Sequence, residues 1–216
     1  MLVSHRHRFI FLKTIKTAGS SIELALQQAL LPACDPKRQD GYDNKEGIVG
    51  ARGDNPQRKK YWNHMNAKDV YDGLGYQKFN AYFRTSAIRN PFDKVVSWFF
   101  FGFHKKTDFA SDREAFNSFL ANAPRFPVDR TIYTIGGAIV CESFVRFERL
   151  QADADALIAR LTCGKQTKLS LGTAKAGNRD KSIPFQDYYN KTSRDAVARA
   201  FAFELENFGY AFKDSA

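Results

Sequence analysis

A lysine within a run of small and hydroxyl-bearing residues, Lys16-Thr17-Ala18-Gly19-Ser20-Ser21, has the composition of a loop that binds a phosphate. The lysine supplies a full positive charge and the serines supply hydroxyl donors, while Ala18 and Gly19 let an anion approach the backbone closely. The run follows the apolar stretch Phe9–Leu12 and precedes a helical pattern that begins at Ile22. This order brings backbone N–H groups and the positive end of a helix dipole to one point. The alternative is an ordinary turn with a solvated lysine.

A second strand–loop–helix arrangement surrounds Arg89. Residues 82–88 fit a strand, Asn90 fits a helix N-cap and Pro91 fits the first helical position. Asn90 and Ser97 are seven residues apart, about two helical turns, and so share one helix face. The guanidinium of Arg89 and the hydroxyl of Ser97 therefore have the chemistry to hold another phosphate. The alternative is that Arg89 caps the helix or pairs with Asp93, and that Ser97 is a small packing residue.

His64 is a candidate catalytic residue. It lies after the long polar segment 32–63 and just before a short helix expected over 67–74. Anchored ends of loops are where catalytic groups tend to lie. The alternative is an ordinary surface or core histidine.

The elements that must position these residues alternate between strands and helices. Further segments fit strands or helices at 144–150, 112–121, 153–161 and 193–208, and Val95, Val96, Phe99, Phe100 and Phe103 have the spacing of a buried helical stripe. The 216 residues are enough for one α/β domain with a substantial core. We expect the turn-rich segment 32–63 to be an acceptor-side or mobile insertion, and the basic segment 170–184 to be a lid loop.

Composition narrows the class of ligand and the compartment. The formal net charge of +10 favours polyanionic ligands such as nucleotides, nucleic acids or acidic glycans. The three cysteines form no CxxC pair, which argues against a zinc ribbon or a disulfide framework and fits reduced thiols in a cytoplasmic protein. No apolar run approaches the length of a transmembrane helix, so we expect a soluble protein without a transmembrane segment.

Together, the two phosphate-loop candidates resemble the sulfotransferases that use 3′-phosphoadenosine 5′-phosphosulfate (PAPS), in particular the carbohydrate sulfotransferases and their bacterial relatives. Residues 15–21 are similar to that family's 5′-phosphosulfate loop, Pro-Lys-Thr-Gly-Gly-Thr-Ser, and residues 88–97 to its 3′-phosphate motif, Val-Arg-Asn-Pro-Tyr-Asp-Arg-Leu-Val-Ser. Residues 144–150 resemble its Arg-Tyr-Glu-Asp-Leu strand, and residues 188–210 its closing helix and Phe-Gly-Tyr end. The sequence departs from the family at Ile15, where proline is usual, at Ala18 and at Arg149.

The resemblance implies a P-loop-like three-layer domain over 1–216, with a central, mainly parallel sheet flanked by helices. It implies transfer of a sulfuryl group from PAPS to a hydroxyl of the acceptor, which the resemblance suggests is a carbohydrate. It also implies that the reaction needs no metal and that nucleic acid is not a partner. By the same resemblance, Lys16 stabilises the leaving phosphate, residues Thr17, Ala18, Gly19, Ser20 and Ser21 hold the 5′-phosphate, and Arg89 and Ser97 hold the 3′-phosphate. It also implies that His64 is the base, since a neutral imidazole is well suited to accept a proton near pH 7. Glu46 and Asp72 are alternative candidates for the base. Two other functions remain open: a P-loop nucleotide kinase, and a non-catalytic module that binds nucleic acid or heparin.

Overall fold

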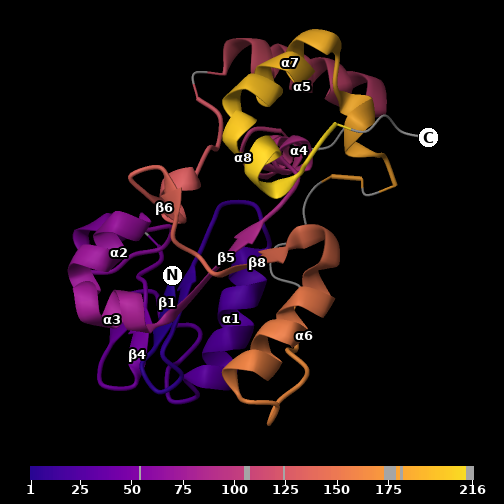
Figure 1. Ribbon diagram of the computed structural model, residues 1–216. Coiled ribbons are helices and arrows are strands. Elements are labelled where there is room, and N and C mark those ends of the chain that lie inside the picture. Colours follow the sequence, from indigo (N-terminus) through magenta and orange to yellow (C-terminus); the bar gives the residue numbers. More distant parts are fainter. Residues whose placement is uncertain (54, 105–107, 124, 173–178, 181, 213–216) are drawn as a thin grey trace. The chain divides into compact units, whose positions relative to one another are not determined.

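The structure is a computed structural model that describes residues 1–53, 55–104, 108–123, 125–172, 179–180 and 182–212 (Figure 1). The chain divides into two compact units. Unit 1 comprises Met1–Ile88 and Asp129–Ala174, and unit 2 comprises Arg89–Val128 and Lys175–Ala216. Hydrophobic clusters fill the interior of each unit. The expectation of one domain over 1–216 stays a prediction.

Unit 1 is built on a six-stranded sheet. Its strands lie in the order β3–β4–β1–β2–β5–β8, with the bounds Tyr42–Asp43, Gly47–Val49, Leu2–Ser4, Phe9–Leu12, Phe83–Ile88 and Ser143–Arg146. β2 and β5 pair in parallel, as do β5 and β8, whereas β1, β3 and β4 pair antiparallel with their neighbours. The sheet is therefore mixed, and its parallel half is the half that the sequence predicts. A separate hairpin joins β6 (Thr134–Ile135) and β7 (Ala138–Ile139).

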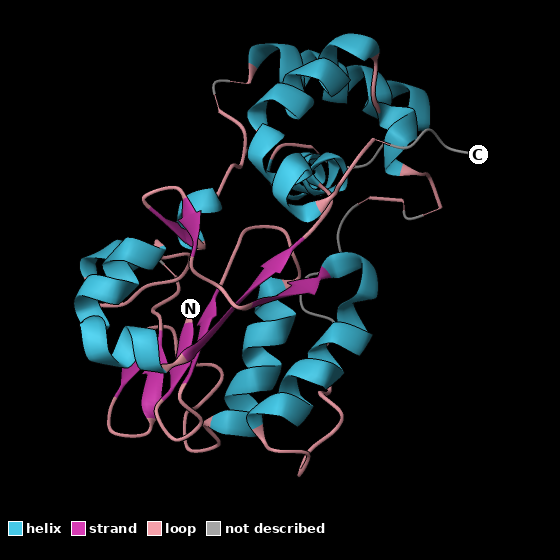
Figure 2. Ribbon diagram, in the orientation of Figure 1, coloured by secondary structure: helices cyan, strands magenta, loops and turns pink. Residues whose placement is uncertain are grey.

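Helices cover both faces of this sheet (Figure 2). On one face pack α1 (Gly19–Leu30) and α6 (Leu150–Leu161), and on the other pack α2 (Ala67–Leu74) and α3 (Tyr76–Ala81). Successive side chains of a strand point to opposite faces, so a strand covered on both faces is apolar throughout. In β2, Phe9 and Phe11 join the first core and Ile10 and Leu12 join the second. This explains the uninterrupted apolar run before the lysine loop.

The described part of unit 2 is helical. It contains α4 (Pro91–Gly102), α5 (Phe109–Asn122), the 3₁₀ turn η4 (Phe185–Tyr188), α7 (Lys191–Ala200) and α8 (Ala202–Phe208). Its core is rich in aromatic rings from α4, α5 and η4. The buried stripe of α4 contains four of the five residues expected. Phe103 is the exception: it follows the last turn of the helix and is 55% exposed.

Three expected elements differ in the structure. The helix expected over 193–208 is two helices, because the chain breaks at Phe201. The strand expected over 144–150 ends at Arg146 and continues as the 3₁₀ turn η3 (Phe147–Arg149). The segment 32–63, expected as a loop, contributes β3 and β4 to the sheet and the turn η1 (Pro56–Arg58).

Candidate functional site

The loop between β2 and α1 has the backbone of an anion-binding turn. Lys16 and Ala18 adopt positive φ angles, 58° and 61°, which few residues other than glycine adopt. Turns with alternating backbone handedness direct successive N–H groups into a concave surface that suits anions. Ala18 is the N-cap residue of α1 and has no side-chain acceptor that could cap the helix. The N-cap side chain therefore leaves the first N–H groups of the helix to other acceptors, and an anion is one kind of acceptor that suits a helix start.

Threonine side chains hold this loop together from within. The Thr14 hydroxyl donates to the carbonyl of Ala87 on β5, and it lies 2.9 Å from the hydroxyl of Thr17. Because the single Thr14 proton goes to Ala87, the Thr17 hydroxyl is the donor in the second bond. Thr17 is buried, so its hydroxyl braces the loop, and its contribution to a phosphate site comes from the backbone N–H.

Gly19 is required at the loop–helix junction because space is lacking there. A Cβ atom at this position would lie 2.9 Å from Cγ of Lys13 and 3.1 Å from the carbonyl oxygen of Thr14. Real Cβ atoms rarely approach other heavy atoms so closely. Ser20 is half-buried and Ser21 is buried in the first turn of α1. The four candidate residues from Ala18 to Ser21 thus form one continuous turn with Lys16.

The structure distinguishes the two lysines of this region. Lys13 is 2% exposed, and its Nζ lies 2.9 Å from Oε2 of the buried Glu23, which Arg52 also contacts at 2.9 Å. Burial by itself raises the pKa of Glu23, but the positive charges of the Met1 amino group, Lys13 and Arg52 outweigh it and lower the pKa to about 2. Lys13 is therefore engaged by a buried carboxylate, which it shares with Arg52 and the Met1 amino group. Lys16 is half-buried within the loop itself.

His64 is attached to the base of the same loop. Its Nδ1 lies 2.9 Å from the backbone carbonyl oxygen of Lys13. A carbonyl only accepts, so Nδ1 carries the proton and Nε2 keeps its lone pair. Burial, and then the positive charge of Lys13, lower the pKa of His64 to about 4. The ring is thus neutral at pH 7 and can accept a proton at Nε2.

The two alternative bases lie elsewhere in unit 1. Asp72 forms an ion pair with Lys68 on α2, at 2.6 Å, and both side chains are exposed. Glu46 is exposed in the turn between β3 and β4. Of the three candidates, His64 is the one for which a hydrogen bond to the loop is observed.

In unit 2, Arg89 is engaged by a carboxylate. Its Nε lies 2.7 Å from Oδ2 of Asp93, and Nη1 of Arg179 lies 2.6 Å from Oδ1 of the same residue. Asn90 caps α4, since its Oδ1 accepts the N–H of Phe92 at 3.0 Å. Burial opposes ionisation of Asp93, but Arg89 and Arg179 outweigh it and lower its pKa. Two guanidinium groups therefore share one carboxylate at the start of α4.

Of the other candidate residues of unit 2 and the expected lid segment, the structure describes some and not others. Ser97 is half-buried on α4, two turns after Asn90. Arg179 is the residue of the expected lid segment 170–184 that the structure ties to Asp93. Residues 173–178 and Lys181 of that segment lie outside the described residues. The basic lid therefore stays a prediction.

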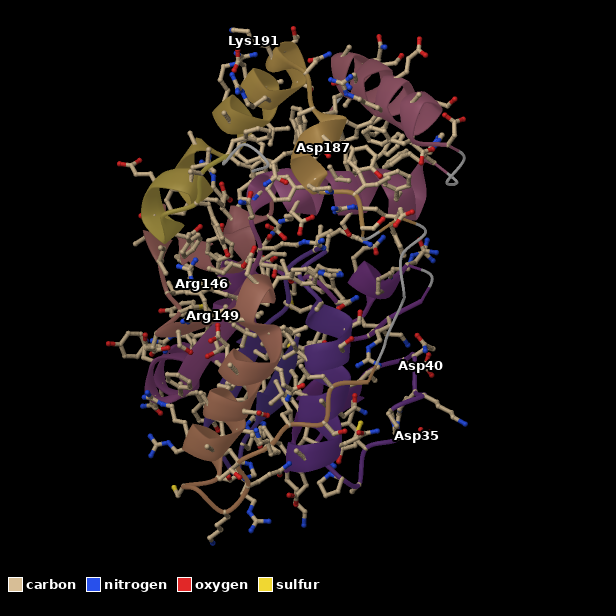
Figure 3. The ribbon with its side chains drawn as sticks, turned by 90° about the vertical axis from the view of Figure 1, so that its right-hand side faces the viewer. Asp35, Asp40, Arg146, Arg149, Asp187 and Lys191 are labelled. Atoms are coloured by element: carbon tan, nitrogen blue, oxygen red, sulfur yellow. The ribbon has the colours of Figure 1, made fainter. Side chains whose placement is uncertain are left out.

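The strand that resembles the family's Arg-Tyr-Glu-Asp-Leu segment ends next to a pair of arginines. Figure 3 shows Arg146 and Arg149 where β8 leads into α6. Arg149 is exposed and pairs with Asp153 at 3.1 Å, while the other oxygen of Asp153 accepts the N–H of Arg146 at 2.9 Å. At the position where the resembled family has aspartate, this chain therefore has a surface arginine that pairs with α6.

Sequence reasoning missed two groups around the loop. One is the buried cluster of Lys13, Glu23 and Arg52, and the other is Asp129, whose Oδ2 accepts the N–H of Ile15 at 2.6 Å. Asp129 is 114 residues from Ile15 in the chain, and no local spacing signals such a contact. A signal did exist for the first group, since Glu23 lies at an inward-facing position of an apolar helix.

Comparison of the chain with protein-family models, with curated proteins and with solved structures gave no match. Among the residues that the structure describes, no group of three or more His, Cys, Asp or Glu side chains could hold a metal ion. In the same part of the chain, no helix is both long and apolar enough to cross a membrane.

Proposed function

We propose that the protein is a PAPS-dependent sulfotransferase with a P-loop-like fold, which transfers a sulfuryl group to an acceptor hydroxyl. The observation that carries this proposal is the bond between His64 and the Lys13 carbonyl. It attaches a neutral, proton-accepting imidazole to the base of a loop that has the backbone of an anion site. A site for group transfer needs both features: a place for the charged donor and a base for the acceptor.

The proposed reaction is an in-line displacement at sulfur. The acceptor hydroxyl gives its proton to Nε2 of His64, its oxygen forms a bond to sulfur, and the bond from sulfur to the 5′-phosphate oxygen breaks. The leaving group is adenosine 3′,5′-bisphosphate, and Lys16 neutralises the charge that develops on its 5′-phosphate. As in phosphoryl transfer, the protein contributes mainly position and charge stabilisation.

The nucleotide would be bound through both phosphates. Backbone N–H groups of residues 17–21 hold the 5′-phosphate at the start of α1, and Arg89 with Ser97 hold the 3′-phosphate. The strands that lead into these two loops, β2 and β5, are parallel neighbours in the sheet. By resemblance, the acceptor is a carbohydrate or a small hydroxylated molecule. The three cysteines are unpaired, which fits a cytoplasmic location.

Binding of the product nucleotide is the first test. Adenosine 3′,5′-bisphosphate should raise the melting temperature by mass action, and ATP at the same concentration should raise it less. Hydrolysis of ATP without affinity for the bisphosphate would favour a nucleotide kinase instead. Steeply salt-dependent binding to random DNA or heparin that needs neither Lys16 nor Arg89 would favour a polyanion-binding module.

Transfer itself is tested with radiolabelled PAPS and a panel of hydroxylated acceptors, carbohydrates first. In the Lys16→Ala variant, transfer should fall by about 10²–10³-fold, the usual effect of removing one group that stabilises transition-state charge. The matched control is Lys165→Ala, which removes an exposed lysine beyond α6 and should transfer normally. Equal rates for the two variants would exclude the role proposed for Lys16.

A further inference from the structure

Asp129 is a buried carboxylate that contacts the candidate anion loop. Its side chain is 5% exposed, and Oδ2 accepts the backbone N–H of Ile15 at 2.6 Å. The bond therefore fixes the residue that immediately precedes Lys16.

The segment that carries Asp129 is held by the core of unit 1. The carbonyl of Asp129 accepts the N–H of Ile132 at 2.9 Å, within the 3₁₀ turn η2 (Arg130–Ile132). Ile132 is buried in the cluster between the sheet and α2. The hydroxyl of Thr131 also donates to Oδ1 of Asn66 at 2.8 Å. The position of Asp129 is thus fixed by the core of unit 1, and its hydrogen bond to Ile15 restrains the loop.

The loop requires such a restraint. Lys16 and Ala18 both have positive φ angles, a conformation that is strained for a residue other than glycine. Conformations of this kind persist only where the surrounding structure enforces them. Ile15 directly precedes these two turns of backbone, and Asp129 binds its N–H group.

We propose that Asp129 is a positioning residue of the anion loop: its carboxylate oxygen accepts the Ile15 N–H and holds the following residues, Lys16 above all, in their binding conformation. This inference rests on the proposed function where nucleotide binding is concerned. The acceptor oxygen of Asp129 is what matters, because its negative charge by itself opposes the binding of an anion. Loss of the oxygen and loss of the charge should therefore have opposite effects.

Three variants separate these effects. Asp129→Ala removes the acceptor oxygen, and Asp129→Asn keeps an acceptor oxygen without the charge. Asp153→Ala is the matched control, because Asp153 makes the same kind of bond, to the N–H of Arg146, at another place in unit 1. Hydrogen exchange of the Ile15–Gly19 amides reports the loop without any ligand, and titration with adenosine 3′,5′-bisphosphate reports its binding.

We expect Asp129→Ala to speed exchange of the loop amides and to weaken bisphosphate binding, each by about tenfold, the equivalent of losing one such bond. Asp129→Asn should keep both properties, with equal or tighter binding, and Asp153→Ala should leave both unchanged. If Asn weakens binding as much as Ala does, or if Ala changes nothing, the positioning role is excluded. Should the Ala variant fail to fold, a tenfold loss of bisphosphate binding in the Asn variant alone still excludes the positioning role.

A second pair of changes tests the bond itself. Ile15→Pro removes the N–H donor, so adding Asp129→Ala to it should weaken bisphosphate binding by less than about twofold, the behaviour of two coupled partners. A full tenfold loss in that background would show that Asp129 acts elsewhere. Faster loop exchange in Asp129→Ala, in a protein whose wild type binds no bisphosphate, would contradict the proposed function and leave the positioning role intact.

Discussion

The two ring nitrogens of His64 have different surroundings, and this difference decides which one can accept a proton. Nδ1 donates to the Lys13 carbonyl, so Nε2 holds the free lone pair. A pKa of about 4 keeps this lone pair available throughout the neutral range. A low pKa also makes the imidazole a weaker base, and general-base catalysis is then favoured by precise placement rather than by strong proton affinity.

The pH dependence of the wild type and of His64→Asn tests this assignment. If His64 is the base, the transfer rate should stay level from pH 7 to pH 5 and fall only near pH 4. His64→Asn keeps a donor toward the Lys13 carbonyl, so it should bind the bisphosphate normally and lose about 10²–10⁴-fold in transfer rate. An acidic limb near pH 6.5 in the wild type would contradict the low pKa.

Folding stability gives an independent readout of the same group. The pKa of His64 is about 4 in the folded protein and 6.5 in an unfolded chain, so the unfolded state binds more protons between these values. The stability that neutral His64 contributes is therefore present above pH 6.5 and is lost as the pH falls toward 4. The stability advantage of the wild type over His64→Asn should shrink across this window in denaturant titrations.

Single residues were predictable from sequence where the cause is local. The Asn90 cap and the small residues of the Lys16 loop follow from propensities and sterics within a few positions. Asp129 and the Lys13–Glu23 pair were not predictable, because their partners are set by tertiary packing. Arg89 is an intermediate case. The sequence allowed it either to cap the helix or to pair with Asp93, and the structure shows the pairing.

One buried carboxylate joins four segments. Glu23 on α1 binds the Met1 amino group before β1, Lys13 at the end of β2 and Arg52 in the segment after β4. Removing one partner from a buried ion pair leaves an uncompensated charge, which typically costs 3–5 kcal/mol. Glu23→Gln should therefore lower the free energy of unfolding at pH 7 by about 3 kcal/mol, measured in urea.

The pH dependence of this loss has a defined sign. The pKa of Glu23 is lowered from 4.5 to about 2, so its contribution is present above pH 4.5 and is lost as the pH falls toward 2. The difference between the wild type and Glu23→Gln should accordingly narrow below pH 4.5. If the wild type and Glu23→Gln already have similar free energies of unfolding at pH 7, the ion pairs of Glu23 do not stabilise the folded protein.

The helices of unit 2 depend on caps that the sequence displays only in part. Asn190 begins α7: its Oδ1 accepts the Ser193 N–H at 2.8 Å, and the Ser193 hydroxyl accepts the Asn190 N–H at 3.0 Å. Asn190→Ala should cost about 1 kcal/mol of unfolding free energy, the usual value for a lost N-cap. Asn207→Ala, which removes an exposed side chain on α8, is the control and should change the melting temperature little.

The elements that sequence analysis missed are short. β1, β3 and β4 have two or three residues each, too few for a periodic pattern to identify a strand. They form half of the sheet because neighbouring strands provide their hydrogen-bond partners. The prediction of one long helix over 193–208 is wrong for a related reason. The helical spacing of apolar residues continues through Phe201, but the backbone leaves the helical conformation at that residue. The spacing of apolar residues predicts which side chains are buried, but it does not predict where a helix is interrupted.

At the scale of the whole molecule, the candidate residues are divided between two units. Unit 1 carries the Lys16 loop and His64, and unit 2 carries Arg89 and Ser97. The chain passes from one unit to the other between Ile88 and Arg89, directly after β5. The proposed function assigns the 5′-phosphate to residues of unit 1 and the 3′-phosphate to residues of unit 2, and each assignment is tested separately.

Comparison of two nucleotides tests these assignments. Adenosine 3′,5′-bisphosphate carries both phosphates, and adenosine 5′-monophosphate lacks the one assigned to Arg89. Wild-type protein should bind the bisphosphate about 10- to 100-fold more tightly, the range expected from one charged hydrogen-bonding group. Arg89→Ala should remove most of this preference and leave the affinity for the monophosphate unchanged, as measured by calorimetry. Lys16→Ala should weaken the binding of both nucleotides, because both carry the 5′-phosphate.

If Arg89→Ala weakens the binding of both nucleotides equally, Arg89 supports the structure of unit 2 and does not contact the 3′-phosphate. Its pairing with Asp93 makes that outcome physically reasonable, so the ratio of the two affinities, rather than either one alone, is the quantity that decides.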